Sequence, residues 1–394
     1  MLYKKFQDEE LSVFAMGCMR LPVIDGDDTN INEQAATEMI AYAIEHGVTY
    51  FDTAWGYHGG NSECVVGKIL ARYPRESFNL ASKFPGYDSA NMGKTEEIFE
   101  EQLRKCGVDY FDFYLVHNVC EMNIEQYLDD AQYGTLSYLI EQKKRGRIRH
   151  LGFSAHGTAE TIRRFLEAYG QHMEFCQLQL NYFDYTFQDT KGKMAVAQEW
   201  GLPIWVMEPL RGGSLCKLSA EEEAKLRALH PDWSAVEWAL RWLQAQPEVT
   251  CILCGSSTLE QISQNIALLS EEKPLGEQDF PALQEIVDAR VKENVQPCTK
   301  CRYCVSHCPI GIDIPWMLEL YNEHKLSGGG FIAPMALAAV EEGKKPADCI
   351  ACGACAAVCP QQIDIPGVLA DFTKLLRNFF PRCICSFHFS SLFI

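Results

Sequence analysis

Eight cysteines near the carboxyl end of the sequence form two runs with the same internal spacing. Each run has the pattern C-x2-C-x2-C-x3-C-P. The first run comprises Cys298, Cys301, Cys304 and Cys308. The second comprises Cys349, Cys352, Cys355 and Cys359. The offset between the copies, 349 minus 298, is 51 residues, and Ile-Asp-Ile-Pro at 312–315 recurs at 363–366 with the same offset. Identical spacing in two copies indicates a duplicated unit that binds metal through thiolates.

The spacing of each run suits an iron–sulfur cluster. In the two-cluster ferredoxins of bacteria, three cysteines of such a run ligate one [4Fe–4S] cluster, and the fourth, before the proline, ligates the other. We therefore predict two [4Fe–4S] clusters with crossed ligands. A zinc site would use four ligands in two pairs and would leave the fourth cysteine of each run without a role. A disulfide framework is disfavoured, because the other ten of the 18 cysteines show no pattern and no signal peptide is expected.

The segment around the two runs resembles a known iron–sulfur module. Between Cys308 and Cys349 lie 40 residues (309–348), too many for the compact β-rich ferredoxin, and they contain a helix-like stretch at 316–321 and a glycine break at 328–330. This arrangement is similar to the α-helical dicluster ferredoxin-type domain, and the resemblance covers residues 291–370. Residues 371–394 turn abruptly apolar and aromatic. We predict that they form a tail, to which the sequence assigns no role.

Residues 1–290 alternate short β-branched or aromatic runs with helical stretches. Eight strands are predicted, at 11–17, 48–52, 78–82, 111–116, 148–153, 175–180, 203–208 and 249–254. The helices that follow them are predicted to begin near Asn32, Ser62, Lys94, Gly134, Thr158, Asp189, Ala235 and Thr258. Eight even βα units predict an α/β protein with a (β/α)8 TIM barrel rather than a doubly wound sheet. No G-x-G-x-x-G follows the first strand, which disfavours a Rossmann cofactor site.

Polar residues that can do chemistry stand where the predicted strands end, the rim that carries function in such barrels. Asp52 follows the second strand, Lys83 the third and His117 the fourth. A buried Asp and Lys are costly unless they pair, so Asp52 is expected to neutralise Lys83. Lys83 is expected to lower the pKa of Tyr57, which would make this phenol an acid or base near neutrality. His117 is expected to donate a hydrogen bond or relay a proton; the alternative is a purely structural ion pair beside a core histidine.

At these residues the sequence resembles the aldo-keto reductases, over about residues 1–290. The motifs that carry the resemblance are Asp52-Thr-Ala-x-x-Tyr57, Ala-Ser-Lys83, Leu-Val-His117, Gly152-Phe-Ser154, Pro209-Leu-x-Gly-Gly213 and Gly255-Ser-Ser, followed by Asn265. The resemblance implies carbonyl or alcohol redox chemistry in which Tyr57 is the general acid or base. The implied catalytic tetrad comprises Asp52, Tyr57, Lys83 and His117.

The resemblance also implies a nicotinamide cofactor, NADP(H) or NAD(H), that lies across the rim. Its implied contacts are Gly17, Met19, Arg20, Ser154, Gln177, Met207, Pro209, Leu210, Gly255, Ser256, Gln261 and Asn265, with His156 as a further candidate. Two departures from the common family pattern fall on this site. Met207 stands where many relatives stack a tyrosine under the nicotinamide, and Gly255 and Gln261 stand where many hold the 2′-phosphate with Lys and Arg. NADPH is expected over NADH, but its 2′-phosphate is expected to be recognised less strongly than in those relatives.

The composition limits the compartment and the partners. Hydrophobic residues make up 47% of the chain, which is typical of a globular protein, and a formal charge of −18 disfavours nucleic acid as a partner. The sequence predicts neither a membrane span nor a secretory signal, so the expected location is cytoplasmic. The expected partners are a small carbonyl or alcohol substrate and a redox protein.

Hydride chemistry and iron–sulfur chemistry differ in the number of electrons that they move. A nicotinamide passes two electrons as a hydride, whereas each cluster takes one, and a flavin is the usual converter between the two modes. Coupling would therefore need a flavin or another one-electron intermediary, and the sequence contains no separate flavin domain. The alternative is an ordinary carbonyl reductase, or a barrel that no longer turns over, with clusters that are structural or redox-sensing.

Overall fold

The computed structural model describes residues 1–298, 301–330 and 332–383, without the side chains of 378–383. The first of its two units comprises Met1–Leu210 and Leu215–Pro281, and the second comprises Arg211–Ser214 and the chain from Ala282 onward. The boundary predicted at 290 falls inside helix α13 (Phe280–Asn294). The boundary predicted at 370 falls inside helix α17 (Ile365–Cys383), and residues 384–394 of the predicted tail lie outside the described residues.

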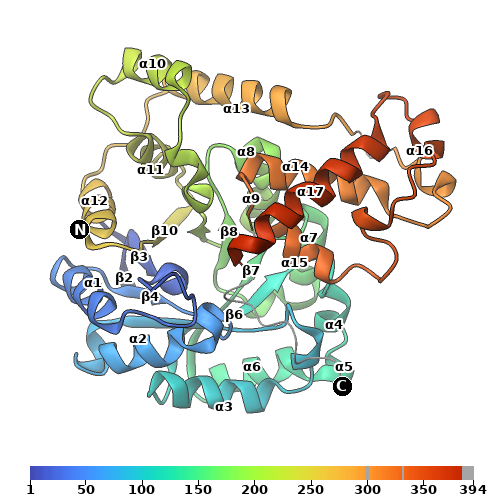
Figure 1. The fold of residues 1–394 in the computed structure, drawn as a ribbon. Helices are drawn as coiled ribbons and strands as arrows, with labels where there is room; N and C mark the ends of the chain where they lie inside the picture. Colours follow the sequence, from blue (N-terminus) through green and yellow to red (C-terminus); the bar gives the residue numbers. More distant parts are fainter. Residues whose placement is uncertain (299–300, 331, 384–394) are drawn as a thin grey trace. The chain divides into compact units, whose positions relative to one another are not determined.

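Eight parallel strands close into a barrel in the first unit, in the order β10-β3-β4-β5-β6-β7-β8-β9 (Figure 1). They are β3 (Phe14–Gly17), β4 (Tyr50–Asp52), β5 (Asn79–Phe84), β6 (Phe111–Val119), β7 (Ile148–Ala155), β8 (Cys176–Gln179), β9 (Ile204–Met207) and β10 (Val249–Gly255). Each corresponds to one predicted strand, so the predicted TIM barrel is confirmed. Pairing of the first barrel strand with the last, Phe14 with Ile252 and Gly17 with Gly255, closes the ring.

The helices of the first unit connect successive parallel strands, as a parallel sheet requires, except that α12 follows the last strand. They are α1 (Glu33–Glu45), α2 (Ser62–Leu70), α3 (Thr95–Cys106), α4 (Ile124–Leu128), α5 (Asp130–Tyr133), α6 (Thr135–Lys144), α7 (Ala159–Tyr169), α8 (Asp184–Phe187), α9 (Thr190–Glu199), α10 (Ala220–Leu229), α11 (Ala235–Gln244) and α12 (Leu259–Leu268). The predicted starts are confirmed where side chains cap them, because Asn32, Thr158 and Thr258 each accept a hydrogen bond from a first-turn N–H.

The predicted strand at 11–17 is wrong as a single element. It divides into β2 (Glu9–Ser12), which pairs with β1 (Tyr3–Phe6) as an antiparallel hairpin, and β3, which enters the barrel. The break has a local cause, because the Ser12 hydroxyl donates to the Phe14 carbonyl and the Ser12 N–H donates to Thr49 Oγ1. These two bonds turn the chain from the hairpin into the barrel.

The hairpin contributes a side chain to the barrel core. Phe6, only 4% exposed, lies edge-on to Trp205 and Phe175, with ring centroids 5.0 and 6.3 Å away, and 5.7 Å from the ring of Phe113. Aromatic pairs in such arrangements stabilise beyond the area that they bury. The barrel interior beneath the rim is therefore a packed aromatic core.

The second unit is helical around its two cysteine runs. Besides α13, its helices are α14 (Ile314–Ser327), α15 (Ile332–Ala338), α16 (Ala354–Ala357) and α17. Helix α14 packs against both α15 and α17, and the isoleucines of both Ile-Asp-Ile-Pro copies are buried in the core of this unit. Within the described ranges, none of the helices combines the length and apolarity needed to cross a bilayer.

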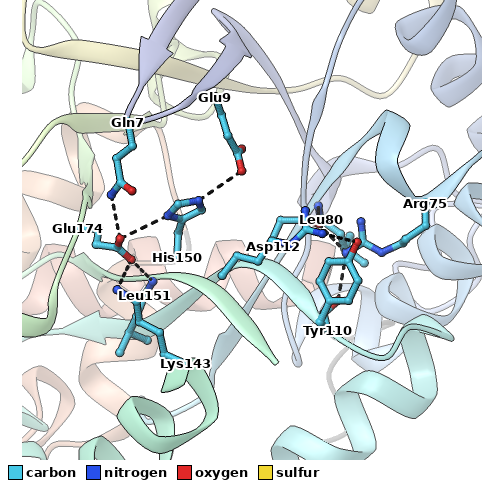
Figure 2. A network of polar contacts seen from close by, with 11 residues as sticks. Gln7, Glu9, Arg75, Leu80, Tyr110, Asp112, Lys143, His150, Leu151 and Glu174 are labelled. Carbon is cyan, nitrogen blue, oxygen red and sulfur yellow. Dashed lines mark hydrogen bonds and ion pairs between the residues drawn. The ribbon is translucent and has the colours of Figure 1, made fainter. Parts of the chain in front are cut away.

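A charged network at His150 of β7 joins the hairpin to the barrel (Figure 2). The His150 ring nitrogens lie 3.4 Å from Glu9 of β2 and 3.4 Å from Glu174, which also accepts hydrogen bonds from Gln7 and the Leu151 N–H. Burial alone would lower the pKa of His150, but the hydrogen bonds that its ring donates to the two carboxylates raise it to about 9. Below that pH the imidazolium links the hairpin to the barrel.

We expect the stability of the first unit to depend on pH through His150. The folded pKa of about 9 exceeds the ordinary value of 6.5, so the stabilisation is complete below about pH 6.5 and is lost as the pH rises through 9. His150→Gln should remove on the order of 2–3 kcal/mol of this pH-dependent free energy of unfolding, measured by urea titration at pH 6 and 10. The exposed control His46→Gln should keep the wild-type dependence; an unchanged dependence in His150→Gln would contradict the assignment.

Candidate functional site

Two charged side chains lie buried at the carboxyl ends of neighbouring strands. Asp52 ends β4 and Lys83 lies near the end of β5, which pairs with β4 in the barrel. The Lys83 ammonium donates to Asp52 Oδ1 at 2.5 Å and to the Thr53 carbonyl at 2.8 Å, and its side chain is 0% exposed. The structure thus brings together the predicted pair, as the cost of burying either charge alone requires.

Tyr57 lies beside this pair, in the turn that follows β4 (η2, Tyr57–Gly60). Its hydroxyl is 3.4 Å from Lys83 Nζ, and the ammonium is 4.9 Å from the centre of its ring. Burial raises the pKa of the Tyr57 phenol above its usual range, and the Lys83 charge offsets only part of this increase. Lys83 thus lowers the pKa of Tyr57 as predicted, but the expectation that this phenol titrates near neutrality is wrong, because desolvation outweighs the neighbouring cation. The phenol is protonated at neutral pH.

Within the Asp52–Lys83 pair, the lysine stays protonated. Burial alone would lower the pKa of Lys83, but the Asp52 carboxylate and the Tyr57 oxygen raise it. Burial raises the pKa of Asp52, against the opposing effect of Lys83. Lys83 is consequently a permanent cation at physiological pH, fixed within hydrogen-bonding distance of a neutral phenol.

His117 of β6 completes the group. Its ring lies nearly perpendicular to that of Tyr57, with centroids 6.4 Å apart, and to that of Tyr87, 5.3 Å away. Burial, and then the Lys83 charge, holds the pKa of His117 well below its usual range, so the ring is neutral. Its Nδ1 is buried without a hydrogen-bond partner in the described part of the chain. A neutral ring with an unpaired nitrogen can hydrogen-bond a ligand.

Amide oxygens without partners mark the neighbouring part of the rim. Ser154 of β7 pairs in register with Gln177 of β8, and Ser154 Oγ accepts a hydrogen bond from the Asn118 N–H at 2.9 Å. Among the described residues, Gln177 Oε1 and Asn118 Oδ1 are buried with no hydrogen-bond partner. Two buried acceptors in this state suit a ligand that brings an amide N–H, as nicotinamide does. Asn118 was missed from the sequence, although it directly follows His117.

The remaining candidate cofactor contacts gather where β3 meets β10. Gly17 pairs with Gly255, and a Cβ on Gly255 would lie 3.5–3.6 Å from the side-chain carbons of Arg20, so the aliphatic part of Arg20 packs along this segment. Ser257 Oγ donates to the Arg20 carbonyl, and Ser257 N–H donates to Gln261 Oε1. Asn265 Nδ2 lies 3.4 Å from Ser256 Oγ, and Met19 lies in the same short turn as Arg20. This cluster therefore brings together the predicted positions Gly17, Met19, Arg20, Gly255, Ser256, Gln261 and Asn265.

The last predicted contacts follow the neighbouring strands. Met207 ends β9 and pairs in register with Gln179, and Pro209 and Leu210 follow it in the chain. His156 follows β7, and burial lowers its pKa to about 4, which makes it neutral. These positions lie at the same carboxyl ends of the strands as the amide group described above.

The cysteines of the second unit line two cavities. One is lined by Cys308 of the first run together with Cys349, Cys352 and Cys355 of the second. The other is lined by Cys359 of the second run together with Cys298, Cys301 and Cys304 of the first. None of these eight cysteines forms a disulfide with any residue that the structure describes. Three cysteines from one run and one from the other is the crossed set predicted from the spacing, and four thiols around each cavity fit a [4Fe–4S] cluster.

The repeated Ile-Asp-Ile-Pro segments start the two helices that flank these cavities. Asp313 Oδ1 accepts a hydrogen bond from the Trp316 N–H at the start of α14, and Asp364 Oδ1 accepts one from the Gly367 N–H at the start of α17. Proline is well suited to the first turn of a helix, because the N–H that it lacks would have no partner within the helix there. Each copy therefore stops the cysteine run and begins a helix, so the repeat outside the cysteines is structural.

Comparison with known families agrees with both halves of this description. The model of the aldo/keto reductase family matches residues 15–288. The chain belongs to the aldo-keto reductase family. A model of the 4Fe-4S dicluster domain matches residues 297–363, which contain both cysteine runs. The chain is thus an aldo-keto reductase barrel followed by a ferredoxin-type domain.

Curated relatives share the barrel. The chain is 27% identical over 320 residues to the probable aldo-keto reductase 1 of Glycine max, across 72% of this chain and 86% of that protein. It is 24% identical over 311 residues to the NADH-specific methylglyoxal reductase of Escherichia coli (strain K12), across 68% of this chain and 91% of that enzyme.

Solved structures show the same fold. The aldo-keto reductase AKR11C1 from Bacillus halodurans, in its holo form, matches with a TM-score of 0.58 and 23% identity, over 73% of this chain and 96% of that chain. The aldo-keto reductase from Klebsiella pneumoniae in complex with NADPH matches with a TM-score of 0.59 and 20% identity, over the same shares. At these identities the likeness is one of fold.

Removing Lys83 from this aldo-keto reductase site should destabilise the barrel in a pH-dependent way. Lys83→Met leaves Asp52 buried without its cation, which typically costs about 3–5 kcal/mol at pH 7. The folded pKa of Asp52 then lies above its unfolded value of 3.8, so the cost should shrink as the pH falls towards 4, where the folded carboxyl becomes protonated and the unfolded one is partly protonated.

Chemical denaturation at pH 4 and 7 measures this cost. Asp52→Asn in the Lys83→Met background should restore much of the loss at pH 7. Lys68→Met removes an exposed ion pair with Glu33 and should cost at most about 1 kcal/mol. Equal destabilisation by Lys83→Met at both pH values would show that lost packing, rather than an unpaired carboxylate, is the cause.

Proposed function

We propose that this protein interconverts a small carbonyl compound and its alcohol with a nicotinamide cofactor, and that Tyr57 transfers the proton. The observation that carries the proposal is the buried Asp52–Lys83 pair, whose ammonium lies 3.4 Å from the Tyr57 hydroxyl. The methylglyoxal named for the Escherichia coli relative makes a small aldehyde or ketone the first substrate to test.

The four residues have separable tasks in carbonyl reduction. Tyr57, kept protonated by burial, donates its proton to the carbonyl oxygen. Lys83 stabilises the phenolate that remains, because its charge is permanent and close. The neutral His117 ring hydrogen-bonds the same oxygen and orients it towards Tyr57. Asp52 keeps Lys83 in place, and alcohol oxidation uses the same groups in reverse.

Nicotinamide, when bound, supplies or accepts the hydride. The unpaired oxygens of Asn118 and Gln177 would hold its carboxamide, with Ser154 beside them. The segment 255–265 would hold the adenosine, with hydrogen bonds in place of the charges at Gly255 and Gln261. Arg20, whose side-chain carbons pack beside Gly255, would supply a cation to a 2′-phosphate there, so NADPH remains the expected cofactor and NADH the alternative.

The ferredoxin-type domain would hold two [4Fe–4S] clusters in its two cavities, and each cluster, when bound, exchanges single electrons. Exchange with a redox protein partner is the function that such a domain supports. Communication between the clusters and the nicotinamide would still need an intermediary that handles one electron at a time, such as a flavin.

Tyr57→Phe should lower the kcat of carbonyl reduction by at least about 10²-fold, because it removes the proton donor. The Kd of NADH or NADPH, measured by fluorescence titration, should change less than twofold, since the phenol is assigned to the substrate. Methylglyoxal and a panel of small aldehydes serve as substrates. Tyr73→Phe, on the loop after α2, is a matched control that should leave kcat unchanged. Normal turnover by the Tyr57→Phe variant would refute the assignment.

The crossed lining of the cavities predicts which cysteines share a cluster. Anaerobically purified protein should contain about eight iron and eight sulfide per chain. A Cys301→Ser/Cys359→Ser double variant should lose one cluster and keep about four iron, because both cysteines line one cavity. Cys301→Ser/Cys308→Ser should lose both clusters, because these cysteines line different cavities although they belong to one run.

Iron analysis and electron paramagnetic resonance distinguish these outcomes. Stoichiometric zinc, or the opposite ranking of the two double variants, would contradict crossed [4Fe–4S] ligation. Turnover with NADH or NADPH that is unaffected by loss of either cluster would favour structural or redox-sensing clusters instead.

A further inference from the structure

A second buried carboxylate lies behind the candidate catalytic residues. Glu63, the second residue of α2, is 0% exposed. Its Oε1 accepts hydrogen bonds from Ser82 Oγ at 2.6 Å and Gln102 Nε2 at 2.7 Å, and its Oε2 accepts one from Lys105 Nζ at 2.7 Å. The lysine side chain is only 10% exposed. A buried carboxylate with three such donors is fully neutralised and holds each donor in a fixed place.

Close packing of two helices makes this arrangement possible. Gly67 of α2 faces Cys106 of α3 so closely that a Cβ on Gly67 would lie 2.2 Å from the Cys106 carbonyl oxygen. Only glycine permits this approach, because any side chain would overlap the facing backbone. The carboxylate of α2 therefore reaches Gln102 and Lys105 of α3 directly.

One arm of the network holds the strand that carries Lys83. Gln102 Nε2 lies 3.0 Å from the main-chain carbonyl of Lys83, and Ser82, which donates to Glu63, is the preceding residue. Tyr114 of β6 fixes the other end of the amide, because its hydroxyl donates to Gln102 Oε1 at 2.5 Å. Through Gln102 and Ser82, Glu63 sets the position of the backbone from which the ammonium extends.

The other arm holds the turn that carries Tyr57. Lys105 Nζ lies 4.7 Å from the centre of the Trp55 ring, a cation–π distance. Trp55 lies in the same turn as Tyr57, whose N–H donates to the Ala54 carbonyl. A lysine that is fixed by Glu63 thus also fixes Trp55.

We infer that Glu63 is a positioning residue that sets the separation of Lys83 and Tyr57 by anchoring the strand of one and the turn of the other. Glu63 touches neither reacting atom in this arrangement, and it acts through Ser82, Gln102 and Lys105. This inference rests on the proposed role of Tyr57 and deepens it. A displacement of about 1 Å in such a site can lower a rate about 10²-fold.

A double-mutant cycle in the full-length protein tests the inference. Glu63→Gln should lower kcat for reduction of methylglyoxal, or of another small aldehyde that the unaltered protein reduces, by about tenfold or more. KM and the Kd of the nicotinamide should change less than twofold. In the Tyr57→Phe background, Glu63→Gln should lower kcat less than twofold, because the geometry that it disturbs no longer matters. A purely structural effect would lower kcat equally in both backgrounds.

Two further variants keep the test decisive. Lys105→Met breaks the arm to Trp55 and should reproduce the loss, whereas Lys105→Arg keeps a cation for both Glu63 and Trp55 and should retain most of kcat. If Glu63→Gln does not fold, the Lys105 pair decides. Glu33→Gln, which alters an exposed ion pair to the same helix α2, is the matched control and should leave kcat unchanged.

The outcomes separate this inference from the proposed function. Turnover that survives Tyr57→Phe refutes the proposed role of Tyr57 itself. Loss of turnover in Tyr57→Phe, together with wild-type kcat in folded Glu63→Gln and Lys105→Met proteins, refutes only the positioning role of Glu63.

Discussion

The ion pair between Lys83 and Asp52 is the constraint on which the rim of the barrel depends. Neither charge reaches water, so each must remain against the other, and only adjacent strands β4 and β5 can keep them there. The cation then acts on its surroundings. It lies beside the Tyr57 phenol, and it adds to the burial that keeps His117 neutral. Glu63 and Lys105 repeat the arrangement between α2 and α3, so β5 lies between two buried pairs, each with one lysine and one carboxylate.

The ends of the strands and the spacing of the cysteines were the features from which the fold and the candidate sites could be predicted. The alternation of strands and helices located all eight barrel strands, and the rule that chemistry stands at the carboxyl ends of strands singled out Asp52, Lys83 and His117. The crossed lining of the two cavities also followed from the spacing alone, since the fourth cysteine of a run cannot reach the cluster held by the first three.

Effects that arise only from burial could not be predicted from the sequence. The pKa of Tyr57 is one example. Desolvation raises this pKa and Lys83 lowers it, and only the three-dimensional surroundings decide which effect is larger. Glu63 is another, since an acidic residue in the first turn of a helix is usually a solvated one. The hairpin β1–β2 was missed because the break at Ser12 depends on a hydrogen bond to Thr49, a residue distant in the sequence.

The crossed cysteine sets also bear on the order in which the protein matures. The barrel closes once β10 has been synthesised, since that strand pairs with β3, and amino-terminal domains generally fold first during translation. The cavity that contains Cys298 lacks its fourth thiol until Cys359, 61 residues later (359 minus 298), has been made. Neither cysteine run can therefore complete a four-cysteine site alone. We therefore expect iron to enter either cavity late, after parts of both cysteine runs have been made.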